Sequence, residues 1–179
     1  TELLVARSKT LRQLALLDVR NSELGLLKVI FRFPGVLAML PADAREDYFD
    51  ATVWRSYAEQ SDGAWIQPAA ADLTAVREVR KVLAHSAFDP QTMFYIAGHA
   101  RATLCAMRID AQEKDPARRI QFDATNRGDG RVPWESGVPA GVKTWYMDVA
   151  HGDLSAAEEG FPAILDVLSF GNTIRIPAT

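Results

Sequence analysis

The residues of this chain best suited to chemistry are a carboxylate and an imidazole, each in a short loop of its second half. Asp129 lies between two glycines in the segment Gly128–Pro133, and His151 follows 22 positions later in Val149–Leu154. A carboxylate that holds one imidazole nitrogen leaves the other nitrogen able to take a proton from a nucleophile. We therefore predict that Asp129 and His151 are the acid and base of a catalytic triad.

Each loop also has an ordinary structural interpretation. Gly-Asp-Gly is a common sequence in turns, and a lone histidine is more often a surface or capping residue than a catalytic base. The order of the two residues favours the catalytic interpretation, because acid and then base follow successive predicted strands, as in α/β-hydrolases. The 22 positions between them leave room for one loop and one strand, so both loops can lie at one sheet edge.

Other candidate residues have simpler roles. Asp148, His151 and Asp153 form a D-x-x-H-x-D cluster that could ligate a metal, but a catalytic metal site needs three or more convergent ligands. His99, after a predicted strand, could contact a ligand or lie in a turn. His85, at a predicted helix end, is favoured there by the helix dipole. We predict no metal and no cofactor.

The hydrophobic pattern changes near residues 89–90. Before them, apolar residues recur at helical spacing from positions 8, 22, 50 and 71, with prolines between the segments. Trp54, Tyr57 and Trp65 in this half either line an apolar cleft or pack in a core. Beyond residue 90, strands are expected at 92–98, 102–109, 120–124 and 143–150.

The last element expected is a helix near the end of the chain. Ser155 and Glu158 are predicted to form its capping box, and Gly171 its C′ residue. An apolar stripe is predicted at Phe161, Ile164, Leu165 and Leu168.

These elements predict an α/β fold. A helical cap at 1–88 would pack over part of a mostly parallel sheet, whose C-terminal strands lie in 89–179. The only cysteine, Cys105, is expected to be a buried small hydrophobe.

The two loops resemble those of a known enzyme family. Gly128–Pro133 is similar to the Gly-Asp-Gly-Thr-Val-Pro acid loop of lipase-like α/β-hydrolases related to lecithin:cholesterol acyltransferase, with Arg131 in place of Thr. Val149–Leu154 is similar to their histidine loop. Phe33–Val36, followed by Leu40 and Pro41, resembles the lid of certain bacterial members.

The resemblance implies a partial α/β-hydrolase fold in which Asp129 is the triad acid and His151 the triad base. It also implies that residues up to about 88 form a lid over an acyl-binding cleft. The family's Gly-x-Ser-x-Gly nucleophile motif does not occur in the chain. Ser136 and Ser155 are the serines nearest the motifs, and neither follows a strand into a helix.

We therefore expect a fragment of a serine acyl hydrolase, with its nucleophile upstream of Thr1, that is inactive by itself. Its substrate would be a small apolar ester or a lipid-like molecule. The alternatives are a non-catalytic, hydrolase-derived interaction module and a metal-dependent hydrolase.

The composition limits the kinds of partner that the chain can bind. The net charge of -3, with acidic and basic residues interspersed, argues against nucleic acid, and no apolar run is long enough for a transmembrane segment. A single cysteine fits a reducing compartment, so a cytoplasmic location is expected. A homodimer through an open sheet edge or an apolar helical face is also expected.

Overall fold

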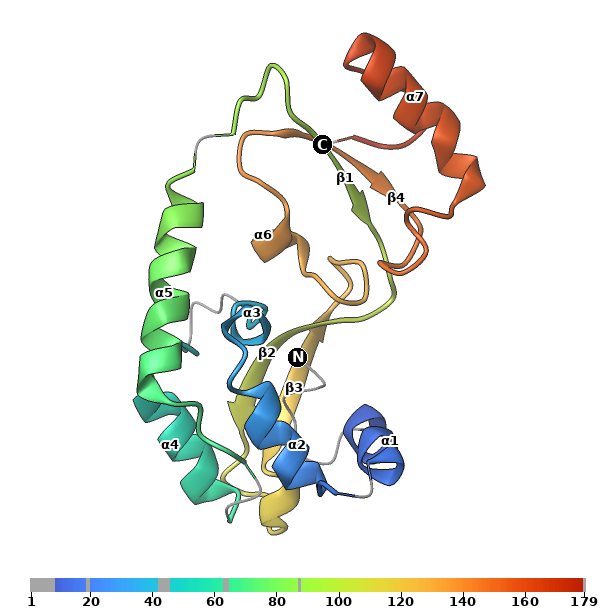
Figure 1. Ribbon diagram of the computed structural model, residues 1–179. Coiled ribbons are helices and arrows are strands. Elements are labelled where there is room, and N and C mark those ends of the chain that lie inside the picture. Colours follow the sequence, from blue (N-terminus) through green and yellow to red (C-terminus); the bar gives the residue numbers. More distant parts are fainter. Residues whose placement is uncertain (1–8, 19, 42–45, 63–64, 87, 179) are drawn as a thin grey trace. The chain divides into compact units, whose positions relative to one another are not determined.

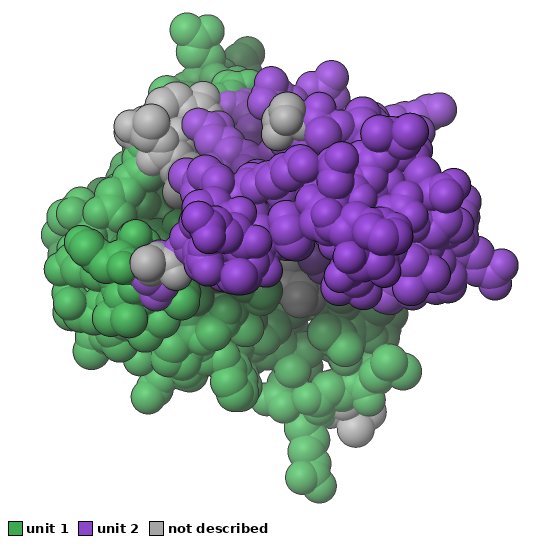
Figure 2. Space-filling view, turned by 90° about the horizontal axis from the view of Figure 1, so that it is seen from above, with its two compact units in different colours: residues 1–85, 106–122 green, residues 86–105, 123–179 purple. Residues whose placement is uncertain are grey.

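The computed structural model describes residues 9–18, 20–41, 46–62, 65–86 and 88–178. The chain forms two compact units, the first from residues 1–85 and 106–122 and the second from 86–105 and 123–179 (Figure 2). The first unit is mostly helical and the second contains the parallel strands, so the fold is a mixture of α and β elements (Figure 1). Residues 106–122, which we assigned to the sheet region, belong to the first unit.

Five helices make up most of the first unit: α1 (Lys9–Leu17), α2 (Glu23–Ile30), α3 (Pro34–Leu37), α4 (Ala51–Gln60) and α5 (Ala70–Ala84). Asp50 caps α4, because its carboxylate accepts a hydrogen bond from the backbone N–H of Thr52. Ser22 caps α2 in the same way, accepting from Gly25. These caps begin the helices where the apolar spacing begins.

Aromatic side chains form the centre of this unit. Trp54 is fully buried, stacks on Trp65 with ring centroids 5.7 Å apart, and donates its indole N–H to Tyr48 O at 2.7 Å. Tyr57 packs edge-on against Trp54. Of the two interpretations of Trp54, Tyr57 and Trp65, core packing is therefore the one confirmed.

The apolar residues that recur at helical spacing along α5 are only partly buried. Leu73 and Val76 lie in the core, whereas Val79 and Leu83 are exposed. Helical spacing shows which residues share a face, but it cannot show how far along the helix that face is covered.

The second unit is built on two parallel strands, β1 (Phe94–Gly98) and β4 (Lys143–Met147), which pair in register from Phe94 with Lys143 to Gly98 with Met147 (Figure 1). The outer edge of β4 meets the end of the described chain, where Tyr146 donates its backbone N–H to Pro177 O at 2.8 Å. Between β1 and β4 the chain forms a two-stranded antiparallel ribbon, β2 (Thr103–Ile109) and β3 (Ile120–Thr125), joined by the 3₁₀ turn η2 (Pro116–Arg118). All four predicted strands are present.

Two short elements and a final helix complete the second unit. They are α6 (Trp134–Gly137), the 3₁₀ turn η3 (Glu158–Gly160) and α7 (Phe161–Phe170), which ends at Gly171 in the left-handed region as predicted. The predicted capping box is wrong. Ser155 is exposed in a turn and Glu158 belongs to η3, because Pro162 fixes the first turn of the helix further along the chain.

The predicted stripe on α7 is also wrong. Ala163 and Val167 are the buried residues, and Phe161, Leu165 and Leu168 are exposed. The helix therefore uses its small side chains for packing and presents its large ones outward. None of the helices in the described ranges has the length and apolar character that a membrane span requires.

Replacing Trp54 by Ala should lower the free energy of unfolding by about 3–5 kcal/mol, because it removes a fully buried aromatic ring and leaves a cavity. Phe170→Ala is the matched control: its ring is 80% exposed, so the change should stay within about 0.5 kcal/mol. Urea unfolding followed by circular dichroism measures both. Similar losses in the two variants would contradict the placement of the core.

Candidate active site

The loop that carries Asp129 is held at the carboxyl end of β1 by hydrogen bonds across the base of the ribbon. Ala100 N donates to Gly128 O at 2.7 Å, and Gly130 N donates to the hydroxyl of Thr103 at 2.8 Å. The strand that precedes Asp129 is therefore β3 of the antiparallel ribbon, and not a strand of the parallel sheet. The ribbon leaves the end of β1 and returns the chain to that same end.

Two glycines permit the close approach of these segments. A Cβ atom on Gly98 would lie 2.5 Å from Val149 O and 2.9 Å from the Cβ of Asp129. A Cβ on Gly128 would lie 2.6 Å from the hydroxyl oxygen of Thr103. No real Cβ tolerates such distances, so glycine at both positions lets the acid loop and histidine loop meet the end of β1.

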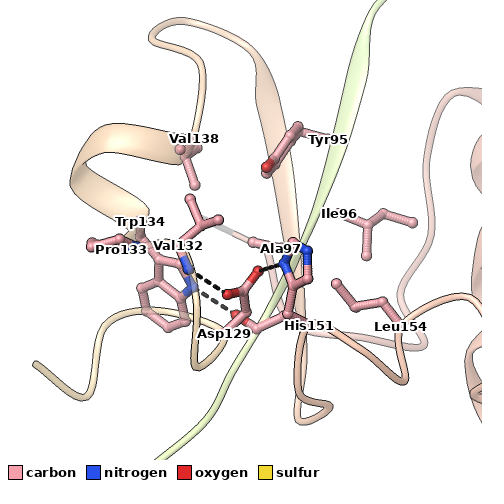
Figure 3. Close-up of a pocket in the computed structure, with 12 residues that line it drawn as sticks. Tyr95, Ile96, Ala97, Asp129, Val132, Pro133, Trp134, Val138, His151 and Leu154 are labelled. Atoms are coloured by element: carbon pink, nitrogen blue, oxygen red, sulfur yellow. Dashed lines mark hydrogen bonds and ion pairs between the residues drawn. The ribbon is translucent and has the colours of Figure 1, made fainter. Parts of the chain in front are cut away.

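The structure brings Asp129 and His151 into direct contact (Figure 3). The Nδ1 atom of His151 lies 2.8 Å from Oδ2 of Asp129, and the backbone N–H of His151 donates to the backbone oxygen of Asp129 at the same distance. The carboxylate is buried, and the imidazole is 41% exposed. The acid is thus enclosed while the base remains accessible.

The second carboxylate oxygen of Asp129 accepts two backbone hydrogen bonds, from Arg131 N at 2.9 Å and Val132 N at 2.7 Å. Burial alone would raise the pKa of Asp129, but the hydrogen bonds from Val132, His151 and Arg131 outweigh burial and lower it. Asp129 is therefore ionised at neutral pH. Arg131 acts here through its backbone, so the difference from the Thr of the resembled loop leaves this contact intact.

A cavity of about 90 Å³ opens beside the imidazole. Asp129, His151 and Tyr95 contribute the ionisable groups that line this cavity. The remaining walls are mostly apolar. These walls comprise Ile96, Ala97, Val132, Pro133, Trp134, Val138 and Leu154, with Gly98 and Gly137. Within the described part of the chain, Nε2 of His151 has no hydrogen-bond partner.

Among the residues that the structure describes, no serine, threonine or cysteine lines this cavity. Ser136 is exposed and its hydroxyl donates to Pro133 O at 3.3 Å, and Ser155 is exposed in a turn. Cys105 is half-buried in β2 rather than fully buried as we expected. The described residues therefore place an acid and a base together without a nucleophile beside them.

A second histidine and carboxylate meet near the same strand ends. Nδ1 of His99 lies 2.7 Å from Oδ1 of Asp148, and the ring of His99 packs against Trp134. The Asp148 side chain is 93% exposed, so this pair is screened by water and contributes little stability.

The D-x-x-H-x-D cluster does not converge. Asp148 contacts His99, His151 contacts Asp129, and Asp153 is exposed, and the described residues contain no group of three or more metal-ligating side chains. His85 forms the C-cap of α5, as predicted from its position, with Nδ1 2.6 Å from Lys81 O.

Sequence reasoning missed three residues that shape the site. Thr103, fully buried in β2, anchors the acid loop; Trp134 donates its indole N–H to Gly98 O at 2.7 Å; and Tyr95 lines the cavity. A polar threonine opening an apolar strand was the one available signal for Thr103.

Comparisons of the chain with protein-family models, with curated proteins and with solved structures gave no match.

Gly98→Ala should break the contact between Asp129 and His151 and lower the free energy of unfolding by about 1–3 kcal/mol, because its methyl group would overlap Val149 O and the Cβ of Asp129. The downfield proton resonance of the His151 Nδ1–H reports the contact. Gly152→Ala is the control, since a Cβ there meets nothing within 4 Å. An unchanged resonance in the Gly98 variant would contradict the geometry.

The Asp129 carboxylate should stabilise the fold in a pH-dependent way. Its pKa is lowered by folding, so its contribution is present above the ordinary value of 3.8 and is lost as the pH falls through the folded-state pKa. Asp129→Asn should therefore be less stable than the original chain by about 1–2 kcal/mol near neutral pH, and the gap should close in acid. Urea unfolding across pH measures it, with exposed Asp153→Asn as the control; a gap that widens in acid would refute the assignment.

Proposed function

We propose that this chain supplies the acid and base of a serine acyl hydrolase, an esterase or lipase-like enzyme, whose nucleophilic serine lies outside these 179 residues. The observation that carries the proposal is the 2.8 Å contact between Nδ1 of His151 and Asp129, with Nε2 beside an apolar cavity. An Asp–His pair in this arrangement is the base that serine hydrolases use.

The chemistry follows from the protonation of the pair. Asp129 accepts a hydrogen bond from Nδ1–H of His151, so Nε2 of the neutral imidazole carries the lone pair that removes the serine proton. The serine oxygen then attacks the ester carbonyl, and the imidazolium returns the proton to the leaving alcohol. Asp129 orients the ring and stabilises its positive charge throughout.

The surroundings of the pair support this assignment. The apolar cavity walls suit the alkyl part of a small apolar ester or a lipid-like substrate, and they strengthen electrostatic interactions by excluding water. In this proposal β1 and β4 are the last strands of a mostly parallel α/β-hydrolase sheet, and the helices up to about residue 88 form a lid.

A non-catalytic interaction module is the second candidate. It is favoured by the outward face of α7, where Phe161, Leu165, Leu168 and Phe170 are all exposed. The gene upstream of Thr1 discriminates the two: a Gly-x-Ser-x-Gly motif after an apolar strand supports the hydrolase, and its absence supports the module. Association through α7 would appear as a homodimer in light scattering.

In the protein that includes the serine, a fluorophosphonate probe should label the nucleophile, and His151→Ala should abolish labelling because the serine loses its base. Asp129→Asn should lower kcat by about 10⁴-fold, since the imidazole would adopt the wrong tautomer. Asp148→Asn is the matched control and should stay within a few-fold, because Asp148 contacts the other histidine. Undiminished labelling of the His151 variant would overturn the proposal.

A further inference from the structure

Tyr95 brings a second polar group to the cavity beside His151. It is the second residue of β1 and lines the cavity together with Ala97 and His151. Figure 3 shows its hydroxyl directed toward the space between Val138 and His151. Among the described residues this hydroxyl has no hydrogen-bond partner, although half-buried tyrosine hydroxyls usually find one.

The cavity therefore offers one acceptor and one donor. Because Nδ1–H of His151 donates its hydrogen bond to Asp129, the neutral form of the imidazole presents Nε2 as an acceptor, and Tyr95 presents an O–H donor. A hydroxyl group complements this pair, since it can donate to Nε2 and accept from Tyr95. A carbonyl lacks the donor, and a carboxylate would be repelled by the ionised Asp129.

Tyr95 keeps its proton under ordinary conditions. Burial, and then the negative charge of Asp129, raise the pKa of its phenol above the usual value of 10.0. The hydroxyl consequently remains a donor through the neutral range.

The size of the cavity and the character of its walls limit the size and polarity of the rest of the ligand. An engineered cavity of about 150 Å³ holds benzene, so the 90 Å³ here has room for about four heavy atoms. Ile96, Val132, Val138 and Leu154 contribute apolar walls around this space. The space suits a hydroxyl on a short hydrocarbon group.

We infer that Tyr95 and His151 together form a binding site for the hydroxyl of a short-chain alcohol. The role of this site rests on the proposed function, in which the alcohol is the leaving group of the ester. When the ester C–O bond breaks, its electron pair stays on the alcohol oxygen, which takes the proton from Nε2 of the His151 imidazolium. Tyr95 holds that oxygen by its hydrogen bond.

Titration of the ¹⁵N-labelled 179-residue chain with 2-propanol tests the site, because the ring nitrogens of His151 report on a hydrogen bond to Nε2. Acetone is the matched control ligand, because it has the same number of heavy atoms and a similar size but no donor. We expect 2-propanol to shift the Nε2 resonance saturably at near-neutral pH and acetone not to.

Tyr95→Phe should weaken 2-propanol binding about three- to tenfold, the range for one neutral hydrogen bond. Tyr146→Phe is the matched control variant, because Tyr146 packs on Trp134 through its ring and does not line the cavity. An equal response to acetone, no saturable shift with 2-propanol, or unchanged affinity in the Tyr95 variant would overturn the inference.

This experiment needs no nucleophile, so its outcome is separate from that of the probe-labelling experiment. Loss of alcohol binding with intact labelling would remove the alcohol site and leave the hydrolase proposal standing. Intact alcohol binding without labelling would remove the hydrolase proposal and leave the alcohol site standing.

Discussion

The hydrogen bonds between the ends of the β2–β3 ribbon and β1 determine where the acid of this site lies. Asp129 comes far after β1 in the chain, yet Ala100 and Gly128 bond to each other at the point where the ribbon leaves and returns. Thr103 adds a second connection from within β2. Without this closure, an excursion of two strands would carry the carboxylate away from the histidine loop that follows β4.

The carboxylate of Asp129 is fixed almost entirely by main-chain groups. Its two oxygens receive the N–H groups of Arg131 and Val132 and the imidazole of His151, while its own backbone oxygen binds His151 N. Main-chain donors do not depend on side-chain rotamers, so the acid needs little reorganisation when the histidine changes charge. This arrangement keeps a buried negative charge stable and leaves the imidazole accessible.

The sequence was sufficient to predict the strands and the meeting of Asp129 with His151. Continuous apolar runs bounded by Gly and Pro identify strands. The meeting was expected from loops after neighbouring strands, but β3 and β4 lie in different sheets, and Asp129 reaches His151 because the ribbon returns the chain to the end of β1. The sequence could not show that β2 and β3 form a separate antiparallel ribbon, because a continuous apolar run does not indicate which strand it pairs with.

Local signals failed where tertiary packing decided the outcome. Ser155 and Glu158 have the spacing of a capping box, but Pro162 begins α7 later, and the helix then buries Ala163 instead of its large residues. Tyr95 was missed for a related reason. In a strand that is apolar throughout, no alternation shows which side chain faces a cavity.

The way β4 ends the sheet has a consequence for growth of that sheet. Pro177 accepts a hydrogen bond from Tyr146, and Trp145 pairs with Ala178, so the end of the described chain already covers the outer side of β4 at these positions. A strand that pairs directly with this two-stranded layer without displacing that segment, whether from the same polypeptide or from another molecule, therefore adds beside β1, the strand that carries Tyr95 and ends at the paired acid and base.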